Sequence, residues 1–144
     1  MKLFYSPFHT FVHKVLVTAH ECGHWDNLER IATFPFKNNA GEDCGDSYDI
    51  SPLNPLDKVP TLVTDDGQVI FASQAICEYL EEIAPQVPLL PKDADGRYEV
   101  RRLCAWFDDK FHNEVTSKLL YERVNKKVTG QGYPDSKNVK LGST

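Results

Sequence analysis

The sequence has no long apolar run and no excess of basic residues, and each absence excludes a class of protein. No apolar run approaches the roughly 20 residues that a membrane-spanning helix needs. The formal net charge of −5 argues against general nucleic-acid binding, which relies on a basic face. The beginning of the chain has no small-residue cleavage site of the secretory kind. We therefore expect a cytoplasmic protein with neither membrane nor nucleic-acid partners.

Cys-x-x-Cys pairs are absent as well. The chain has four cysteines, which are widely spaced: Cys22, Cys44, Cys77 and Cys104. Hydrophobic residues make up 41% of the chain, as in globular proteins that build an ordinary core. Without a secretion signal, such a chain does not need disulfides, and we expect the four thiols to be reduced.

What the sequence does have is a strand–turn–strand–helix pattern between residues 61 and 82. Two short apolar runs, Leu62–Val63 and Val69–Phe71, flank Asp66-Gly67, a dipeptide typical of hairpin turns. Ser73 directly precedes the helical pattern and is placed to cap it. A free helix N-terminus at this point favours a carboxylate.

The Val59-Pro60 dipeptide stands just before this pattern. Pro60 has no N–H for a sheet ladder, so it belongs at a strand start or an edge. Val59 keeps an extended backbone whose edge can pair with an added peptide-like strand. Together with the helix N-terminus, this edge predicts a site for a small, acidic, peptide-like ligand.

The rest of the chain extends this pattern on both sides. Residues 2–5 predict a strand, 11–22 a helix ended by Gly23, and 28–36 a second strand, followed by a polar loop at 38–49. The resulting order, β-α-β-loop-β-β-α, is typical of a small α/β sandwich.

Beyond this first domain, residues 1–84, we expect three further parts. A proline-punctuated linker occupies residues 85–96, and a long amphipathic helix follows within 97–127. Residues 128–144 are rich in Gly, Ser, Lys and Asn and are expected to be disordered. The helix carries an apolar stripe that it cannot bury alone: Val100, Leu103, Cys104, Phe107, Phe111 and Val115.

The stretches 53–62 and 73–80, with Met1–Pro7 and Phe11–Val15 before them, resemble the glutathione S-transferase family in order and spacing. The resemblance covers residues 1–84 and continues more weakly from Arg97 to Val124. It implies a thioredoxin-like β-α-β-β-α sandwich followed by a long helix from a truncated all-α domain. The implied function is conjugation of the glutathione thiol to a small hydrophobic electrophile by a homodimer. The alternatives are a non-catalytic glutathione-binding or protein-interaction module, and a fragment without activity.

The resemblance also implies which residues bind glutathione. Val59 pairs its backbone with the cysteinyl part, Pro60 is cis, and Ser73 meets the γ-glutamyl carboxylate. Lys58 is the candidate for the glycyl carboxylate as a flexible cation, and Lys37 is a weaker candidate for the same role. The alternative for Lys58 is a solvated surface lysine without a role in binding. Ala72 stands where the family usually has an acidic residue or glutamine, which implies a lost contact to the ligand amine.

The residue that activates the thiol is left open. The family uses a hydroxyl or a cysteine at the start of the first helix, where the helix dipole favours a thiolate. This register holds His9, which can donate a hydrogen bond or act as a base, and then Thr10, which carries a hydroxyl. Ser6 and Tyr5, at the end of the strand, carry further hydroxyls near this position, and Ser6 is also a candidate contact for glutathione. A site without a dedicated residue is the remaining alternative. No cysteine lies in this register, so dithiol redox chemistry is excluded.

Four histidines near this helix raise the question of a metal. His9, His13, His20 and His24 lie near one face of a helix, in two pairs of i,i+4 spacing. Gly23 ends the helix before the last of them, and no carboxylate or cysteine completes a site on that face. We expect glutathione as cosubstrate and no metal.

Overall fold

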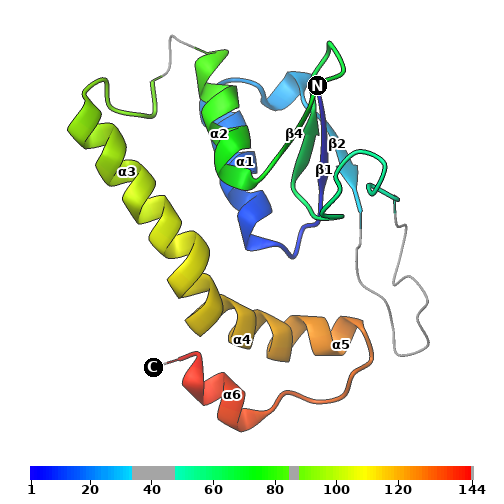
Figure 1. Cartoon of the computed structure of the whole chain (residues 1–144). Helices are drawn as coiled ribbons and strands as arrows, with labels where there is room; N and C mark the ends of the chain where they lie inside the picture. Colours follow the sequence, from blue (N-terminus) through cyan, green and yellow to red (C-terminus); the bar gives the residue numbers. More distant parts are fainter. Residues whose placement is uncertain (34–47, 85–87, 144) are drawn as a thin grey trace. The chain divides into compact units, whose positions relative to one another are not determined.

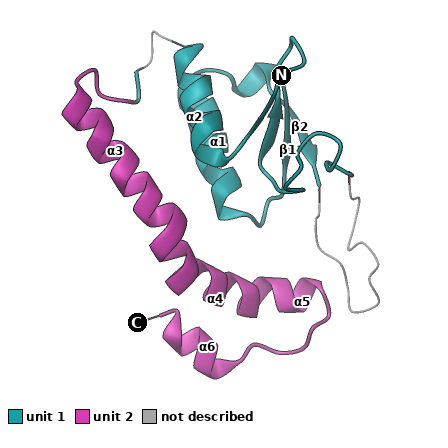
Figure 2. Cartoon of the chain, viewed as in Figure 1, with its two compact units in different colours: residues 1–35, 45–89 teal, residues 36–44, 90–144 magenta. Residues whose placement is uncertain are grey.

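The computed structural model describes residues 1–33, 48–84 and 88–143, and they form two compact units (Figure 1). Described residues up to Leu89 belong to unit 1, and those from Leu90 onward belong to unit 2 (Figure 2). Each unit is described by itself below.

Unit 1 contains a four-stranded sheet in the order β2-β1-β3-β4. Strand β1 (Lys2–Tyr5) pairs in parallel with β2 (Glu29–Ala32) and antiparallel with β3 (Thr61–Val63), which pairs antiparallel with β4 (Val69–Phe71). Because parallel strands need a crossover, helix α1 and the short turn η1 (Trp25–Asn27) lie between β1 and β2. The expected order of elements and the α/β fold are confirmed.

Two helices pack against each other beside the same face of this sheet (Figure 1). Helix α1 (Thr10–Glu21) follows β1, and α2 (Ser73–Glu82) follows β4. Their apolar faces meet the inward side chains of β1 and β3 in one core, formed by Leu3, Val15, Ala19, Leu28, Leu62, Ile76 and Leu80. This core fixes the strand ends and helix starts from which the candidate site is built.

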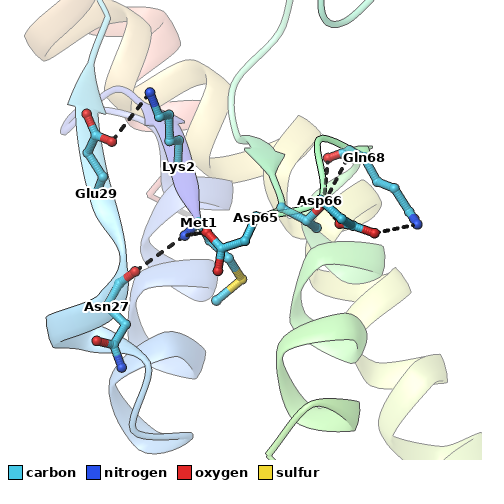
Figure 3. Close-up of polar contacts among 8 residues, drawn as sticks. Met1, Lys2, Asn27, Glu29, Asp65, Asp66 and Gln68 are labelled. Carbon is cyan, nitrogen blue, oxygen red and sulfur yellow. Dashed lines mark hydrogen bonds and ion pairs between the residues drawn. The ribbon is translucent and has the colours of Figure 1, made fainter.

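The turn between β3 and β4 forms where the sequence predicts it. Gly67 has φ +84°, a backbone conformation that residues other than glycine rarely adopt. The amino group of Met1 lies 2.5 Å from the Asp65 carboxylate, and Gln68 Nε2 donates to Asp66 at 3.0 Å (Figure 3). The hairpin is thereby fastened to the start of β1.

Unit 2 is built on a continuous helical stretch from residue 94 to residue 128. It comprises α3 (Ala94–Trp106), η2 (Phe107–Thr116), α4 (Ser117–Leu120), η3 (Tyr121–Asn125) and α5 (Lys126–Val128), with π-type hydrogen bonding in η2 and η3. The stretch begins three residues before the predicted Arg97 because the Asp93 side chain caps it, accepting from Gly96 N at 2.7 Å.

The C-terminal residues of unit 2 differ from the expected disordered tail. Helix α6 (Ser136–Leu141) forms there, capped by Asp135, whose side chain accepts from Lys137 N at 2.8 Å. The buried Glu122 carboxylate accepts from Asp135 N at 2.7 Å and from Asn138 Nδ2 at 3.0 Å. Composition did not indicate this helix, because its anchor lies thirteen residues earlier in the chain.

Glu122 makes the attachment of α6 sensitive to acid. Hydrogen bonds from Lys126, Asp135 and Asn138 lower the pKa of the Glu122 carboxyl from 4.5 to about 2. A carboxyl group whose pKa is lowered by folding stabilises the folded state. This stabilisation is complete above the unfolded-state pKa of 4.5 and is lost as the pH falls from 4.5 towards 2.

We therefore expect α6 to detach as the pH is lowered through this window. Amide chemical shifts of residues 136–141 should move towards random-coil values on acidification, and Glu122→Gln should move them already at pH 7. Glu114→Gln is the matched control, because Glu114 is exposed and forms an ion pair with Lys110 at 2.6 Å. Equal shifts in the two variants would contradict the role of Glu122.

Among the described residues, no helix combines the length and the apolar character that crossing a bilayer requires. The same residues contain no group of three or more His, Cys, Asp or Glu side chains that could hold a metal ion.

Candidate functional site

A pocket of about 220 Å³ lies in unit 1. It is lined by one residue of α1, a run of the loop before β3, and the first residues around α2: Phe11, Asn54, Leu56, Lys58, Val59, Pro60, Ala72 and Ser73. Five of these residues are sequence-predicted binding residues. The fold therefore brings the Val59-Pro60 edge and the start of α2 together, as the pattern predicts.

The backbone of Val59 is one wall of the pocket. The Val59–Pro60 peptide bond is cis, as the resemblance implies. Neither the N–H nor the C=O of Val59 has a hydrogen-bond partner among the described residues, because β3 begins two residues later, at Thr61. An extended ligand can therefore use both groups, as in strand addition.

The start of α2 forms another part of the pocket lining. The residue at the N-cap is Ala72, not Ser73 as expected, because the Ala72 carbonyl accepts the first helical hydrogen bond, from Ile76 N at 3.1 Å. Ala72 has φ +69°, an unfavourable backbone conformation for any residue other than glycine. Such outliers gather at ligand sites, where the surrounding structure holds them.

This helix start is suited to an anion. Helix α2 has no side-chain cap, so the N–H groups of its first turn are left for a ligand. Ser73 is the first helical residue, is 8% exposed and lines the pocket. A carboxylate here would meet backbone N–H groups, a hydroxyl and the positive end of the helix dipole.

Charge in the pocket has one sign. Lys58 is the one charged residue among the described residues that line it. A second anionic group of the ligand can therefore pair with the Lys58 ammonium, whereas a cationic group finds no carboxylate among these lining residues.

The candidates for thiol activation lie at the start of α1. His9 is the N-cap of this helix, with its N–H donating to the Ser6 carbonyl at 3.1 Å. The His9 ring lies 5.8 Å, between centroids, from the ring of Phe11, which lines the pocket. Thr10 is exposed, and Ser6 is fully buried with its hydroxyl unpaired among the described residues. His9 thus contacts a residue that lines the pocket but does not line the pocket itself.

Not every predicted residue reaches the pocket. Ser6, His9 and Thr10 are not among the residues that line it. Lys37 lies outside the described residues. Sequence reasoning gave no role in ligand binding to three that do line it: Phe11, Asn54 and Leu56. The Asn54-Pro55 dipeptide, a turn signal, was available as a hint for Asn54.

The profile of the family described as "Glutathione S-transferase, N-terminal domain" matches residues 8–83, more than half of the chain. The chain belongs to the glutathione S-transferase family.

Among curated relatives, the chain is 40% identical over 97 residues to FtsZ-localized protein A of Caulobacter vibrioides, covering 65% of this chain and 42% of that protein. It is 48% identical over 86 residues to a probable maleylacetoacetate isomerase of Caenorhabditis elegans, covering 58% of this chain and 38% of the relative. The chain thus spans about two fifths of each of these relatives.

Solved structures agree with the fold. A glutathione S-transferase from Rhodospirillum rubrum superposes with a TM-score of 0.83 at 37% identity, covering 98% of this chain and 59% of that one. A glutathione transferase family member from Pseudomonas fluorescens, solved with bound glutathione, has a TM-score of 0.68 at 26% identity, covering 98% and 67%. The thioredoxin-like glutathione S-transferase fold is confirmed, with its long C-terminal helix.

Proposed function

We propose that this protein binds glutathione in the pocket of unit 1 and conjugates the thiol of intact glutathione to a small hydrophobic electrophile. The observation that carries the proposal is the pocket itself, which joins an unpaired backbone edge at Val59 to an uncapped helix N-terminus at Ser73. Glutathione is a peptide-like molecule with a carboxylate at each end, and such a ligand meets both features. Membership of the family supports the same ligand.

In the proposed complex, Val59 pairs with the cysteinyl backbone, and Ser73 and the first turn of α2 bind the γ-glutamyl carboxylate. The glycyl carboxylate meets Lys58. Ala72 supplies no charge for the ligand ammonium, so we expect weak binding. Lys37 and Ser6 remain proposed contacts.

The chemistry proceeds through a thiolate. The thiol proton leaves to His9 or to solvent, with Thr10 as the alternative hydrogen-bond donor, and the sulfur lone pair forms a bond to an electrophilic carbon. The electrons displaced from that carbon leave with a departing group or are protonated after addition to a double bond. If the sulfur is later expelled after rotation about the former double bond, the outcome is isomerisation, a reaction class suggested by the isomerase name of one relative.

A second candidate function is a glutathione-binding interaction module without catalysis. Two observations favour it. A relative that is 40% identical is named for its localisation with FtsZ rather than for a reaction. In this chain the family's hydroxyl position is occupied by His9. A measurable turnover with a model electrophile decides between the two functions.

We also propose a cytoplasmic homodimer. The helical stretch of unit 2 carries three mutually contacting aromatic rings, Trp106, Phe107 and Phe111, whose residues are 44%, 52% and 38% exposed. Exposed aromatic clusters of this kind are typical of interaction surfaces.

The binding proposal is tested by replacing Ser73 with alanine. Loss of a charge-assisted hydrogen bond to the ligand carboxylate is expected to weaken glutathione binding by about 1.5–3 kcal/mol. Isothermal calorimetry measures this difference, with Ser51→Ala as the matched control, because Ser51 bonds Asp49 outside the pocket. Equal affinities for the wild type and Ser73→Ala would place the ligand elsewhere.

A further inference from the structure

Asn54 is a buried polar residue whose whole side chain is engaged beside the pocket. It is 1% exposed and lines the pocket. Its Nδ2 donates to the Lys58 carbonyl at 2.9 Å and to Thr61 Oγ1 at 3.0 Å, while its Oδ1 accepts from Leu56 N at 3.0 Å. Burial without these partners would be costly, so the loop and the side chain hold each other in place.

The Lys58 carbonyl is the centre of this network. It accepts from Asn54 Nδ2 and also from Thr61 Oγ1, which donates at 2.8 Å. Thr61 is fully buried in β3, so one of the two donors belongs to the rigid sheet. Two donors with different origins fix the direction of this carbonyl more firmly than one could.

The direction of the Lys58 carbonyl sets the direction of the next N–H. The carbonyl and the Val59 N–H belong to one planar peptide unit, and in a trans unit they point in opposite directions. The cis bond in this segment is the following one, between Val59 and Pro60. Because Asn54 and Thr61 hold the carbonyl, the Val59 N–H points away from them and stays without a partner among the described residues.

The backbone of the loop is arranged to present Asn54 in this way. Asn54 N donates to Ile50 O at 2.8 Å, and Asp57 N donates to Asn54 O at 2.8 Å. Asp57 has φ +48°, a left-handed backbone conformation, and the chain turns at this residue before it reaches Lys58 and Val59. The fully buried side chain of Ile50 anchors the start of the loop in the apolar cluster with Phe4, Val12 and Val59.

We propose that Asn54, together with the Thr61 hydroxyl, is a positioning residue for ligand binding: it orients the Lys58–Val59 peptide so that the Val59 N–H meets the ligand backbone. This inference rests on the proposed binding of glutathione. Asn54 acts through the peptide and is not a catalytic residue.

Two kinds of substitution separate orientation from folding. Asn54→Asp keeps the shape and the acceptor to Leu56 but replaces both Nδ2 donors with a carboxylate oxygen, which repels the Lys58 carbonyl. Thr61→Val removes only the hydroxyl, whereas Thr61→Ser retains it. Asn27→Asp is the matched control for charge, because Asn27 is exposed and is not among the residues of this pocket.

The experiment records amide NMR spectra of the full chain, first free and then titrated with glutathione. In the free protein, Asn54→Asp and Thr61→Val are expected to shift the Val59 amide resonance, while Thr61→Ser and Asn27→Asp leave it near its wild-type position. Glutathione affinity should fall about tenfold or more in the first two variants, as for a lost hydrogen bond, and stay within about twofold in the other two.

The two levels of the proposal fail differently. A wild-type chain whose Val59 amide does not respond to glutathione would overturn the proposed binding mode. An unshifted Val59 amide in free Asn54→Asp and Thr61→Val would overturn the positioning role, whatever the affinities. If Asn54→Asp does not fold, the Thr61→Val and Thr61→Ser pair decides, because rescue by serine alone identifies the hydroxyl.

Discussion

Replacing His9 with alanine is expected to lower turnover with a model electrophile about 10²- to 10⁴-fold and to leave glutathione affinity within about twofold. The reason is position. His9 is the N-cap of α1, and its ring contacts Phe11, which lines the pocket, but His9 itself does not line it. A group placed in this way can assist the thiol more than it can bind the peptide. Steady-state kinetics with calorimetry on the same samples measure both quantities.

Three further variants make the His9 result specific. His9→Gln retains a hydrogen-bond donor but not a base, so partial activity in this variant would assign orientation rather than proton transfer to His9. His20→Ala is the control, since His20 is exposed near the other end of α1. If Thr10→Ala abolishes turnover and His9→Ala does not, the hydroxyl of Thr10 activates the thiol and our proposal for His9 is wrong.

Phe111→Asp is expected to convert the proposed homodimer into monomer or aggregate. Phe111 contacts both Trp106 and Phe107 in the exposed aromatic cluster, with centroid distances of 6.3 and 5.6 Å. If this cluster is the seam between two copies, an unpaired carboxylate there costs on the order of several kcal/mol. Multi-angle light scattering during size-exclusion chromatography measures the mass, with Asp108→Asn as a neighbouring control that changes charge but not apolar surface.

The same experiment can refute the dimer. A wild-type chain that is a monodisperse monomer and binds no hydrophobic dye would mean that the cluster is covered within one chain. A wild-type dimer that is unaffected by Phe111→Asp would place the interface elsewhere on the molecule.

Local signals in the sequence predict the order of strands and helices in the first unit, whereas the thioredoxin-like arrangement of these elements is implied only by the family resemblance. The Asp66-Gly67 turn, the apolar runs beside it and the stop at Gly23 each act over a few residues, and each appears in the structure where it was expected. The cis bond before Pro60 was implied by family resemblance, and the structure has it.

The differences arise where a distant partner decides. The tail helix α6 depends on Glu122, and the role of Asn54 depends on the carbonyl of Lys58 and the hydroxyl of Thr61. Helix α2 starts at Ser73 rather than after it, because Ala72 is the N-cap. Ala72 has a positive φ of 69°, which alanine rarely adopts, so the sequence does not predict this position. Propensity describes single residues, so it cannot anticipate contacts that only the folded chain creates.

The residues around the 220 Å³ pocket all fall between positions 11 and 73, within unit 1. The groups proposed to hold the thiol donor are therefore encoded together, in one contiguous stretch of sequence. A descendant of this chain could exchange everything after α2 for a different C-terminal part and keep the same proposed binding site for glutathione. Selection could then change which electrophile reacts, or replace catalysis with binding to a protein partner, while the glutathione site stays the same.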